Sequence, residues 1–408
     1  MSHNNTPANA IFLARQPIFD NNLNLFAYEL LFRGSEINQS GVDALNGDIA
    51  TSKVINHTFL EFGIERVLGG KLGFINLTRA FLTGEIPLPF DNNHVVLEVL
   101  EDIVIDEEII EAVKNFSKQG YTIALDDFIY NEDLKPLVDV ADIIKIDLLA
   151  LTDEELAEHV QILKQFDVKL LAEKVESQEQ LQRCKMLGFD FYQGYFFCKP
   201  TIIDDQPLAN NKIATLRVLT ELQRSDASID DIENIIKLDL SLSFKLLRCL
   251  NSAAVASPKK VESLKQAVIY LGLKAIKSWG TIITFSNTNS RMSPELLVTA
   301  LVRAKMAESL ASVFKCNSET AFLLGLFSIA DAMFNKPMSG LLEELPVSKP
   351  IKLALKEGEG ELGKLLMFIR THERGSLTVM PSSLNIPDIN KAYIAATEWA
   401  NHTLRVVN

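Results

Sequence analysis

Polar side chains of a few types recur at or near the carboxyl ends of short apolar segments in the first 200 residues. Five are acids, two are amides and one is a lysine: Glu29, Asn76, Glu98, Asp126, Asp127, Lys145, Glu173 and Gln193. Five acids gathered in one place would repel one another unless cations lay among them. Oxygen ligands without histidine or thiolate favour Mg²⁺ or Mn²⁺ over zinc. The residue types therefore predict a site for hard divalent cations, provided that the fold brings them together.

The adjacent acids Asp126 and Asp127 directly follow the apolar segment 122–125. Two neighbouring carboxylates could bridge two metal ions, and ions about 3.5–4 Å apart suit the hydrolysis of a phosphodiester. Such ions hold the phosphate, generate hydroxide and stabilise the leaving oxygen. An acid after a strand is more often only a helix N-cap or a loop residue, so no single acid identifies the site. The recurrence of polar residues at successive segment ends is what favours catalysis.

The elements that must position these residues alternate between β-rich and helical segments. We expect strands at residues 12–15, 25–32, 72–77, 94–99, 122–126, 143–146, 169–172 and 191–192, and helices at 43–61, 106–120, 152–166 and 177–188. Thr152 and Ser177 are suitable N-caps, and Gly120 and Gly188 are suitable helix ends. This alternation favours a parallel sheet, open or closed into a barrel. Eight strands favour the barrel, in which the carboxyl ends meet at one mouth.

The strand pattern ends after about residue 203, and the remainder is expected to be all-α. Helices are expected after the caps Ser228, Ser241 and Ser263, and at residues 294–314 and 319–333. Gly272 is expected to end the helix that begins after Ser263. The polar segment 201–211 is the expected linker. We therefore predict two domains, an α/β barrel at residues 1–203 and a helical domain at residues 204–408.

The composition narrows the choice of partners. The 408 residues carry a formal charge of −13, which disfavours DNA or RNA as the main partner because such binders need a basic face. By count, residues 1–205 carry −18 and residues 206–408 carry +5. The four cysteines form no CxxC pair, and the first ten residues lack the apolar core of a signal peptide. No apolar run approaches the ~18 residues that span a bilayer. We expect a cytoplasmic protein without membrane insertion.

Motifs in chain order resemble those of the EAL domain, the cyclic di-GMP phosphodiesterase fold. They are ELLFR at 29–33, FINLT at 74–78, LEVLE at 97–101, DDF at 126–128, IKID at 144–147, AEKVE at 172–176, and YQGY at 192–195 leading to Pro200. Leu30 stands where the family name has alanine. The resemblance implies a TIM-like (β/α) barrel that opens cyclic di-GMP to linear pGpG with two Mg²⁺ or Mn²⁺ ions.

The resemblance also implies a role for each residue when it is carried over position by position. One metal ion would be held by Glu29, Asn76, Glu98 and Asp126, and the second by Asp126, Asp127 and Glu173. Lys145 would orient or polarise the attacking water, and Glu173 would share the catalytic role. Gln193 would complete the site, and Arg33 would meet a substrate phosphate. Glu101 and Glu176 would support the loop after the paired aspartates.

Three departures from the family pattern keep a second hypothesis open. Ile129 stands where the family has a glycine, and a β-branched residue does not readily adopt the positive φ of glycine. The loop that follows, residues 130–133, replaces a Thr-Gly-Tyr-Ser-Ser sequence and is shorter. Lys174 replaces the glycine of the Glu-Gly-Val-Glu motif. In the family this loop supports the metal-binding aspartates and a homodimer interface. The alternative function is a nonhydrolytic cyclic di-GMP receptor or a protein-interaction scaffold.

The second half resembles an HDOD domain, a helical relative of the HD phosphohydrolases. The matching segments are LDLSLSFKLLR at 238–248 with Asn251-Ser252, SLKQA at 263–267, and Leu271-Gly272. Residues 325–329, Gly-Leu-Phe-Ser-Ile, stand where an HD enzyme has its His-Asp pair. The resemblance implies a noncatalytic module that regulates the barrel or binds a protein partner. The whole chain then resembles a bacterial signalling family that combines the two domains.

Overall fold

A computed structural model of the chain describes most of the barrel and most of the helical half. The described residues are 11–34, 63–101, 103–194, 218–224, 226–237, 242, 245–246, 250–251, 263–286, 294–334, 337–344, 347–375, 380–381 and 383–407. The expected helix at 43–61 and the expected linker at 201–211 lie outside these residues. Among the described helices, none combines the length and the apolar character needed to cross a membrane.

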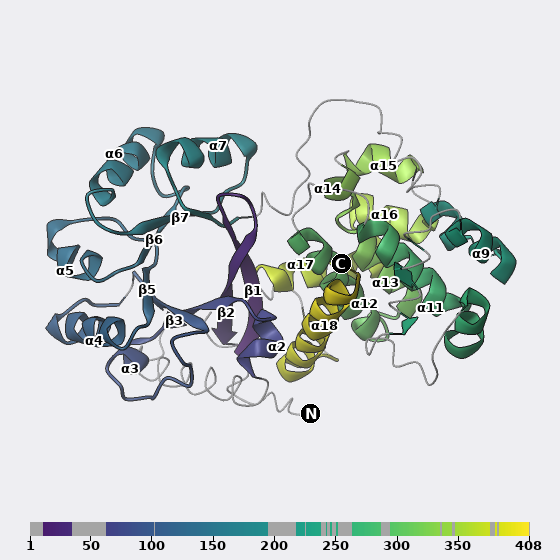
Figure 1. The fold of residues 1–408 in the computed structure, drawn as a ribbon, viewed down its shortest axis with the longest axis horizontal. Helices are drawn as coiled ribbons and strands as arrows, with labels where there is room; N and C mark the ends of the chain where they lie inside the picture. Colours follow the sequence, from purple (N-terminus) through teal and green to yellow (C-terminus); the bar gives the residue numbers. More distant parts are fainter. Residues whose placement is uncertain are drawn as a thin grey trace, which may run out of the picture. The chain divides into compact units, whose positions relative to one another are not determined.

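Eight strands close into a barrel in chain order, which confirms the expected architecture (Figure 1). They are β1 (Ile11–Asp20), β2 (Leu25–Gly34), β3 (Leu72–Leu77), β4 (Val95–Val99), β5 (Thr122–Leu125), β6 (Ile143–Asp147), β7 (Lys169–Glu173) and β8 (Phe191–Tyr192). From β2 to β8 every neighbouring pair is parallel. The carboxyl ends of these seven strands therefore meet at one mouth.

The first strand departs from the expected parallel sheet. β1 runs antiparallel to both β2 and β8. Only residues 21–24 separate β1 from β2, and a parallel crossover needs a dozen or more residues. The Asp20 carboxylate accepts the backbone N–H groups of Asn22 and Asn24, each at 2.8 Å, while Leu23 adopts a φ of 60°. A polar turn thus makes a hairpin where the strand–helix alternation predicted a crossover.

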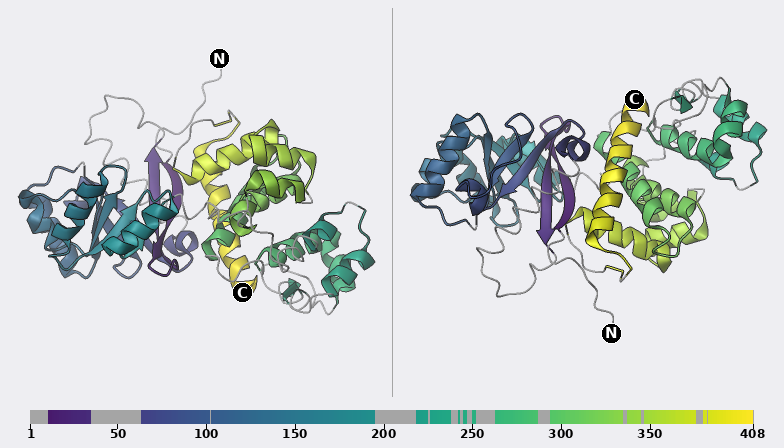
Figure 2. Two further views of the ribbon diagram at one scale, coloured as in Figure 1. Left: turned by 90° about the horizontal axis from the view of Figure 1, so that it is seen from above. Right: turned by 90° about the horizontal axis from the view of Figure 1, so that it is seen from below.

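Helices lie outside the strands of the barrel (Figures 1 and 2). They are α2 (Ile64–Leu68), α3 (Arg79–Leu82), α4 (Glu107–Lys118), α5 (Lys135–Val138), α6 (Asp153–Leu163) and α7 (Gln178–Leu187). Thr152 and Ser177 are the N-caps of α6 and α7, as predicted, and each forms a complete capping box. Gly188 ends α7 with a φ of 83°. These ends explain why the sequence pattern located both helices well.

Two apolar layers follow from the period of two along each strand. The outward-facing residues pack against the helices and form the larger core, which includes Ile75, Leu97 and Ile144. The inward-facing residues form a smaller cluster inside the barrel, which includes Phe74, Val96 and other fully buried side chains. The smaller cluster fills the barrel interior below the mouth.

The chain forms two compact units. One contains Met1–Phe197 and Arg370–Ile394, and the other contains Cys198–Ile369 and Ala395–Asn408. Within the first unit the Leu13 N–H donates to the Asn390 Oδ1 at 3.1 Å, and Ile394 joins the outer core of the barrel. The sequence predicted a single boundary near residue 203, and did not anticipate that residues 370–394 belong with the barrel.

The described elements of the second half are all helical. They are α9 (Ile229–Lys237), α11 (Leu264–Ser286), α12 (Pro294–Leu310), α13 (Ser318–Phe327), α14 (Ala330–Phe334), α15 (Met338–Glu344), α16 (Lys349–Glu357), α17 (Gly360–Glu373) and α18 (Ile386–Val407). Gly272 breaks the helix within α11, where its φ is 83° and its ψ is 155°. A Cβ at Gly325 would lie 2.5 Å from the Ala304 backbone, so only glycine allows α13 to approach α12 so closely. Packing explains Gly325 at the place of the HD pair.

Candidate active site

A single geometric rule places the predicted polar residues at the mouth. On each strand from β2 to β8, the inward-facing apolar residue is followed two positions later by one of them. The pairs are Ala27 and Glu29, Phe74 and Asn76, Val96 and Glu98, Ala124 and Asp126, Ile143 and Lys145, Leu171 and Glu173, and Phe191 and Gln193. Because side chains alternate between faces with a period of two, all seven turn inward one layer above the apolar cluster.

The ammonium of Lys145 lies at the centre of this layer and is almost fully buried. Its Nζ is 2.6 Å from Asp126 Oδ1, 2.8 Å from Glu98 Oε1, 3.0 Å from Glu173 Oε1 and 3.7 Å from Glu29 Oε1. One buried cation therefore contacts acids that lie on, or directly after, four different strands. The sequence located Lys145 at a strand end, whereas its central position is a result of barrel closure.

Burial and charge act against each other in this cluster. Burial raises the pKa of Glu98 well above its usual range and raises that of Glu173 to about 8, and Lys145 only partly opposes both effects. Burial by itself would lower the pKa of Lys145, but the surrounding carboxylates raise it well above its usual value. Without further cations the lysine stays charged, while Glu98 and Glu173 tend to hold protons.

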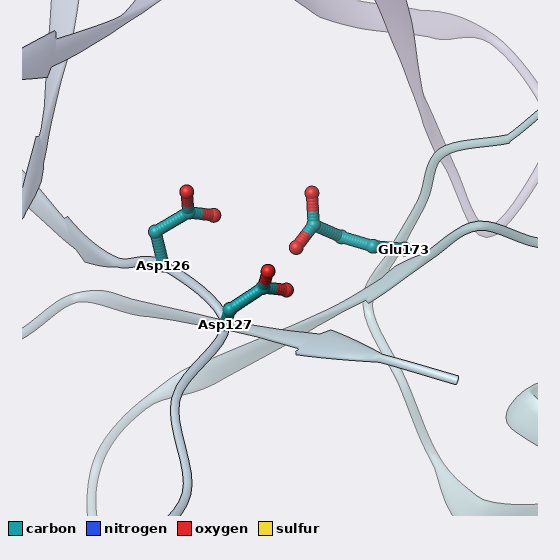
Figure 3. A group of neighbouring side chains, drawn as sticks. All are labelled: Asp126, Asp127 and Glu173. Carbon is teal, nitrogen blue, oxygen red and sulfur yellow. The ribbon is translucent and has the colours of Figure 1, made fainter. Parts of the chain in front are cut away.

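Asp127 joins the cluster by a different route, because alternation alone would turn it away from Asp126. β5 ends at Leu125, and Asp127 adopts a left-handed conformation with a φ of 41°. Carboxylate oxygens of Asp126, Asp127 and Glu173 lie within 4.8 Å of one another. Figure 3 shows the three side chains directed toward a common point. A left-handed residue other than glycine is uncommon, and here this conformation turns the Asp127 carboxylate toward those of Asp126 and Glu173.

The loop that carries the aspartates is fixed by hydrogen bonds to β4, β6 and α6. Asp126 N–H donates to Val99 O at 3.0 Å, and Phe128 N–H donates to Lys145 O at 3.1 Å. The buried His159 of α6 places its Nε2 3.2 Å from Phe128 O, and burial lowers its pKa, so the neutral ring can donate this bond. Ile129 is exposed and does not adopt a positive φ. The strain expected at Ile129 is therefore absent, and the left-handed non-glycine residues at the mouth are Asp127 and Lys174.

The site contains polar atoms suited to a divalent cation. Asn76 Oδ1, Glu98 Oε2 and Asp127 Oδ1 are buried and accept no hydrogen bond from any part of the chain that the structure describes. A buried acceptor without a hydrogen-bond donor is energetically unfavourable, and such oxygens are suitable ligands for a hard cation. Glu29 Oε2, in contrast, accepts a hydrogen bond of 2.6 Å from Gln193 Nε2. The donor set fits Mg²⁺ or Mn²⁺ better than a soft metal.

The charge of the site agrees with two such ions. Ionised Glu29, Glu98, Asp126, Asp127 and Glu173 carry five negative charges, and Lys145 offsets one of them. The remaining charge of about −4 equals what two divalent ions would neutralise. The sequence therefore predicted a set of residues whose summed charge is consistent with two ions.

Two of the predicted residues, Glu101 and Glu176, are not part of this cluster, and a third, Arg33, is described only in its backbone. Arg33 lies on β2, but its side chain is outside what the structure describes. Glu101 is exposed in the turn after β4, and Glu176 is exposed before α7, where its N–H donates to Gln180 Oε1 at 2.7 Å. The roles of Arg33 in phosphate binding and of Glu101 and Glu176 in loop support stay predictions.

Sequence reasoning missed Gln16. In the antiparallel register Ile18 lies opposite Ala27, and Gln16 lies opposite Glu29. Ile18 belongs to the inner cluster, so Gln16 is the inward-facing residue of β1 at the level of the mouth. It was missed because the expected first strand, residues 12–15, ends before Gln16 and was not expected to be antiparallel. The signal that could have found it is the short polar turn at residues 21–24.

The raised pKa of Glu173 predicts that the metal-free protein loses stability as the pH rises from about 4.5 to about 8. In this range the unfolded chain releases the proton of this carboxyl while the folded protein retains it, so rising pH favours unfolding. The test is the melting temperature in EDTA from about pH 5 to about pH 9 for the wild type and Glu173→Gln. The decrease should be smaller in the variant, and equal decreases would contradict the assignment.

Comparisons with known proteins agree with this geometry. The model of the EAL domain matches residues 73–200, and that of the HDOD domain matches residues 211–345. The fold and the site define the class: an EAL-type barrel with an acid-lined mouth, followed by a helical HDOD domain. The chain is 32% identical over 406 residues to the uncharacterized protein YuxH of Bacillus subtilis, covering 97% of this chain and 99% of that protein.

A second relative has a stated activity. The chain is 30% identical over 405 residues to the cyclic di-GMP phosphodiesterase CdgJ of Vibrio cholerae, covering 97% of this chain and 94% of that protein. A solved structure of the Bacillus subtilis YkuI protein, with an EAL domain in complex with substrate c-di-GMP and calcium, matches with 20% identity and a TM-score of 0.40, covering 57% of this chain and 71% of that one. The chain belongs to the family of proteins that join an EAL domain to an HDOD domain.

Proposed function

We propose that the chain is a cyclic di-GMP phosphodiesterase that opens its substrate to linear pGpG with two Mg²⁺ or Mn²⁺ ions. The observation that carries the proposal is the buried cluster of acids around Lys145, with acceptor oxygens on Asn76, Glu98 and Asp127 to which no described residue donates a hydrogen bond. Membership of the EAL family and the activity of the relative CdgJ support the same reaction.

The residues of the site have different proposed roles according to their positions. Glu29, Asn76, Glu98 and Asp126 would hold one ion, and Asp126, Asp127 and Glu173 the other. The ions, when bound, would polarise the phosphate and lower the pKa of water. Lys145 orients the attacking water by donating hydrogen bonds, and Glu173 accepts its proton. Water adds to phosphorus, the bond from phosphorus to one 3′-oxygen breaks, and that oxygen takes up a proton. Gln193 and Arg33 bind the substrate.

Turnover of purified protein is expected to require a divalent cation. With Mg²⁺ or Mn²⁺ the rate of pGpG formation should exceed the rate in EDTA by at least about tenfold, because the acids of the mouth repel an anionic substrate until cations neutralise them. Product is followed by chromatography, and binding is followed in parallel by calorimetry with Ca²⁺. Absence of pGpG with either cation, under conditions in which cyclic di-GMP binds, would refute the enzymatic proposal.

One observation favours a second candidate function, that of a nonhydrolytic receptor. The ammonium of Lys174 pairs with Asp147, and the charges of Asp127 and Glu173, two acids proposed for the second ion, help to raise its pKa. A positive charge there would oppose binding of that ion. Tight binding of cyclic di-GMP without turnover would favour the receptor. Neither binding nor turnover would favour a protein-interaction scaffold.

The helical unit is proposed to regulate the barrel or to bind a protein partner. At residues 325–329, α13 packs closely on α12. The buried Arg303 of α12 also lies there, and its guanidinium donates to Ser328 Oγ at 3.1 Å. This packing suits a structural module. A homodimer, a cytoplasmic location and a signalling role in motility or biofilm formation stay predictions from the sequence.

A further inference from the structure

Lys174 has an unusual backbone for a long side chain. It directly follows Glu173, the last residue of β7, and its φ is 55°. A residue with a Cβ pays roughly 1 kcal/mol or more to remain in the left-handed region. Asp127 has the same conformation directly after its strand, at a φ of 41°. Both turns lie at the mouth, and the turn at Asp127 is explained by the direction of its carboxylate.

The side chain of Lys174 is held by a specific partner. Its Nζ forms an ion pair with Asp147 Oδ2, at the end of the neighbouring strand β6. Asp147 is 13% exposed and Lys174 is 50% exposed, so the pair lies at the rim of the mouth. The other carboxylate oxygen, Asp147 Oδ1, accepts the Leu149 N–H at 2.8 Å. The acid that holds the ammonium is thus itself fixed.

Lys174 directly follows Glu173, one of the three acids drawn in Figure 3. The hydrogen bond that Lys174 Nζ donates to the Asp147 carboxylate is the main cause of the raised pKa of Lys174, and the charges of Asp127 and Glu173 raise it further. These two acids belong to the group of three whose oxygens could hold one ion. Lys145 contacts Glu29 and Glu98 of the other group but also Asp126 and Glu173, so its charge acts on both groups.

We propose that Lys174 is a tethered cation that weakens the divalent-cation site at Asp126, Asp127 and Glu173, and that Asp147 limits this effect by pairing with it. A fixed positive charge near these acids opposes the binding of a divalent cation. The ion pair with Asp147 cancels part of the electrostatic field of the Lys174 ammonium. The two ion sites are therefore unequal in affinity. This inference rests on the metal sites of the proposed function, but not on turnover.

The test uses the full-length protein, MnCl₂ alone as the probe, and calorimetry without nucleotide. Lys174→Gln removes the charge but keeps a side chain, and should tighten the weaker Mn²⁺ site about tenfold, which corresponds to about 1.4 kcal/mol. Lys174→Arg keeps the charge and should resemble the wild type. Asp147→Asn frees the ammonium and should weaken the same site. If Lys174→Gln does not fold, Lys174→Gly serves instead, since glycine tolerates the φ.

A matched control is Lys118→Gln, which makes the same change in net charge. Lys118 is exposed at the end of α4, and helices of this barrel run back from the mouth, so this residue lies at the far end. Equal effects of Lys118→Gln and Lys174→Gln, or weaker Mn²⁺ binding after Lys174→Gln, would overturn the inference. A tightened site in a protein that makes no pGpG would leave the inference standing and refute only the proposed reaction.

Discussion

Asp127→Asn is expected to lower cyclic di-GMP turnover by more than about a hundredfold. Loss of a residue that only supports a metal ligand already costs up to about a hundredfold, and Asp127 is itself a proposed ligand. The change removes one charge from the three acids whose oxygens lie within 4.8 Å of one another. Asparagine is among the few residues that tolerate a left-handed backbone, so the φ of 41° can be kept. The loss of activity should therefore not come from a distorted loop.

Two measurements separate a lost ion from a lost fold in Asp127→Asn. Calorimetry with MnCl₂ should show one ion bound instead of two, and the melting temperature in EDTA should not fall. The control is Asp167→Asn, which makes the same chemical change at an exposed turn before β7, at the opposite end of the barrel from the mouth. Near-normal turnover in Asp127→Asn would refute the role of Asp127 as a ligand.

Lys145→Met is expected to destabilise the metal-free protein by about 3–5 kcal/mol, the usual cost of leaving buried charges without their partner. The ammonium contacts acids on four strands, at distances of 2.6–3.7 Å, and no other cation of the described residues lies among them. Methionine fills similar space without charge, so packing loss contributes little. Urea unfolding in EDTA, compared with the wild type, gives the difference in free energy of unfolding.

Added Mn²⁺ distinguishes the structural from the catalytic role of Lys145. Bound ions would neutralise the same acids, so Mn²⁺ should recover much of the stability of Lys145→Met. Turnover should remain below that of the wild type, because the donor that orients the water is still missing. Lys118→Met, at an exposed position on α4, controls for the substitution itself. Full recovery of turnover with Mn²⁺ would limit Lys145 to a structural role.

The helix boundaries show which structural features can be predicted from neighbouring residues alone. Thr152 and Ser177 were predicted as N-caps, and each forms a capping box with a residue three positions later. The interaction is closed within one turn of the chain, so it needs no tertiary context. Residues 319–333 were expected to continue as one helical segment, but α13 ends at Phe327 and α14 begins at Ala330. Within the break, Arg303 of α12 donates to Ser328 Oγ at 3.1 Å, a tertiary contact that local spacing does not predict.

The sequence by itself determined the ring of polar residues, because a period of two fixes which residues share a face with the inner apolar cluster. Ordered motifs then indicated the family. Tertiary structure alone decided the rest: the hairpin that brings Gln16 opposite Glu29, the left-handed turn of Asp127, and the ion pair between Lys174 and Asp147. The physical reason is the range of the interactions. Facing along a strand is set by neighbouring residues, whereas the position of a charge among its partners is set by strands that meet only when the barrel closes.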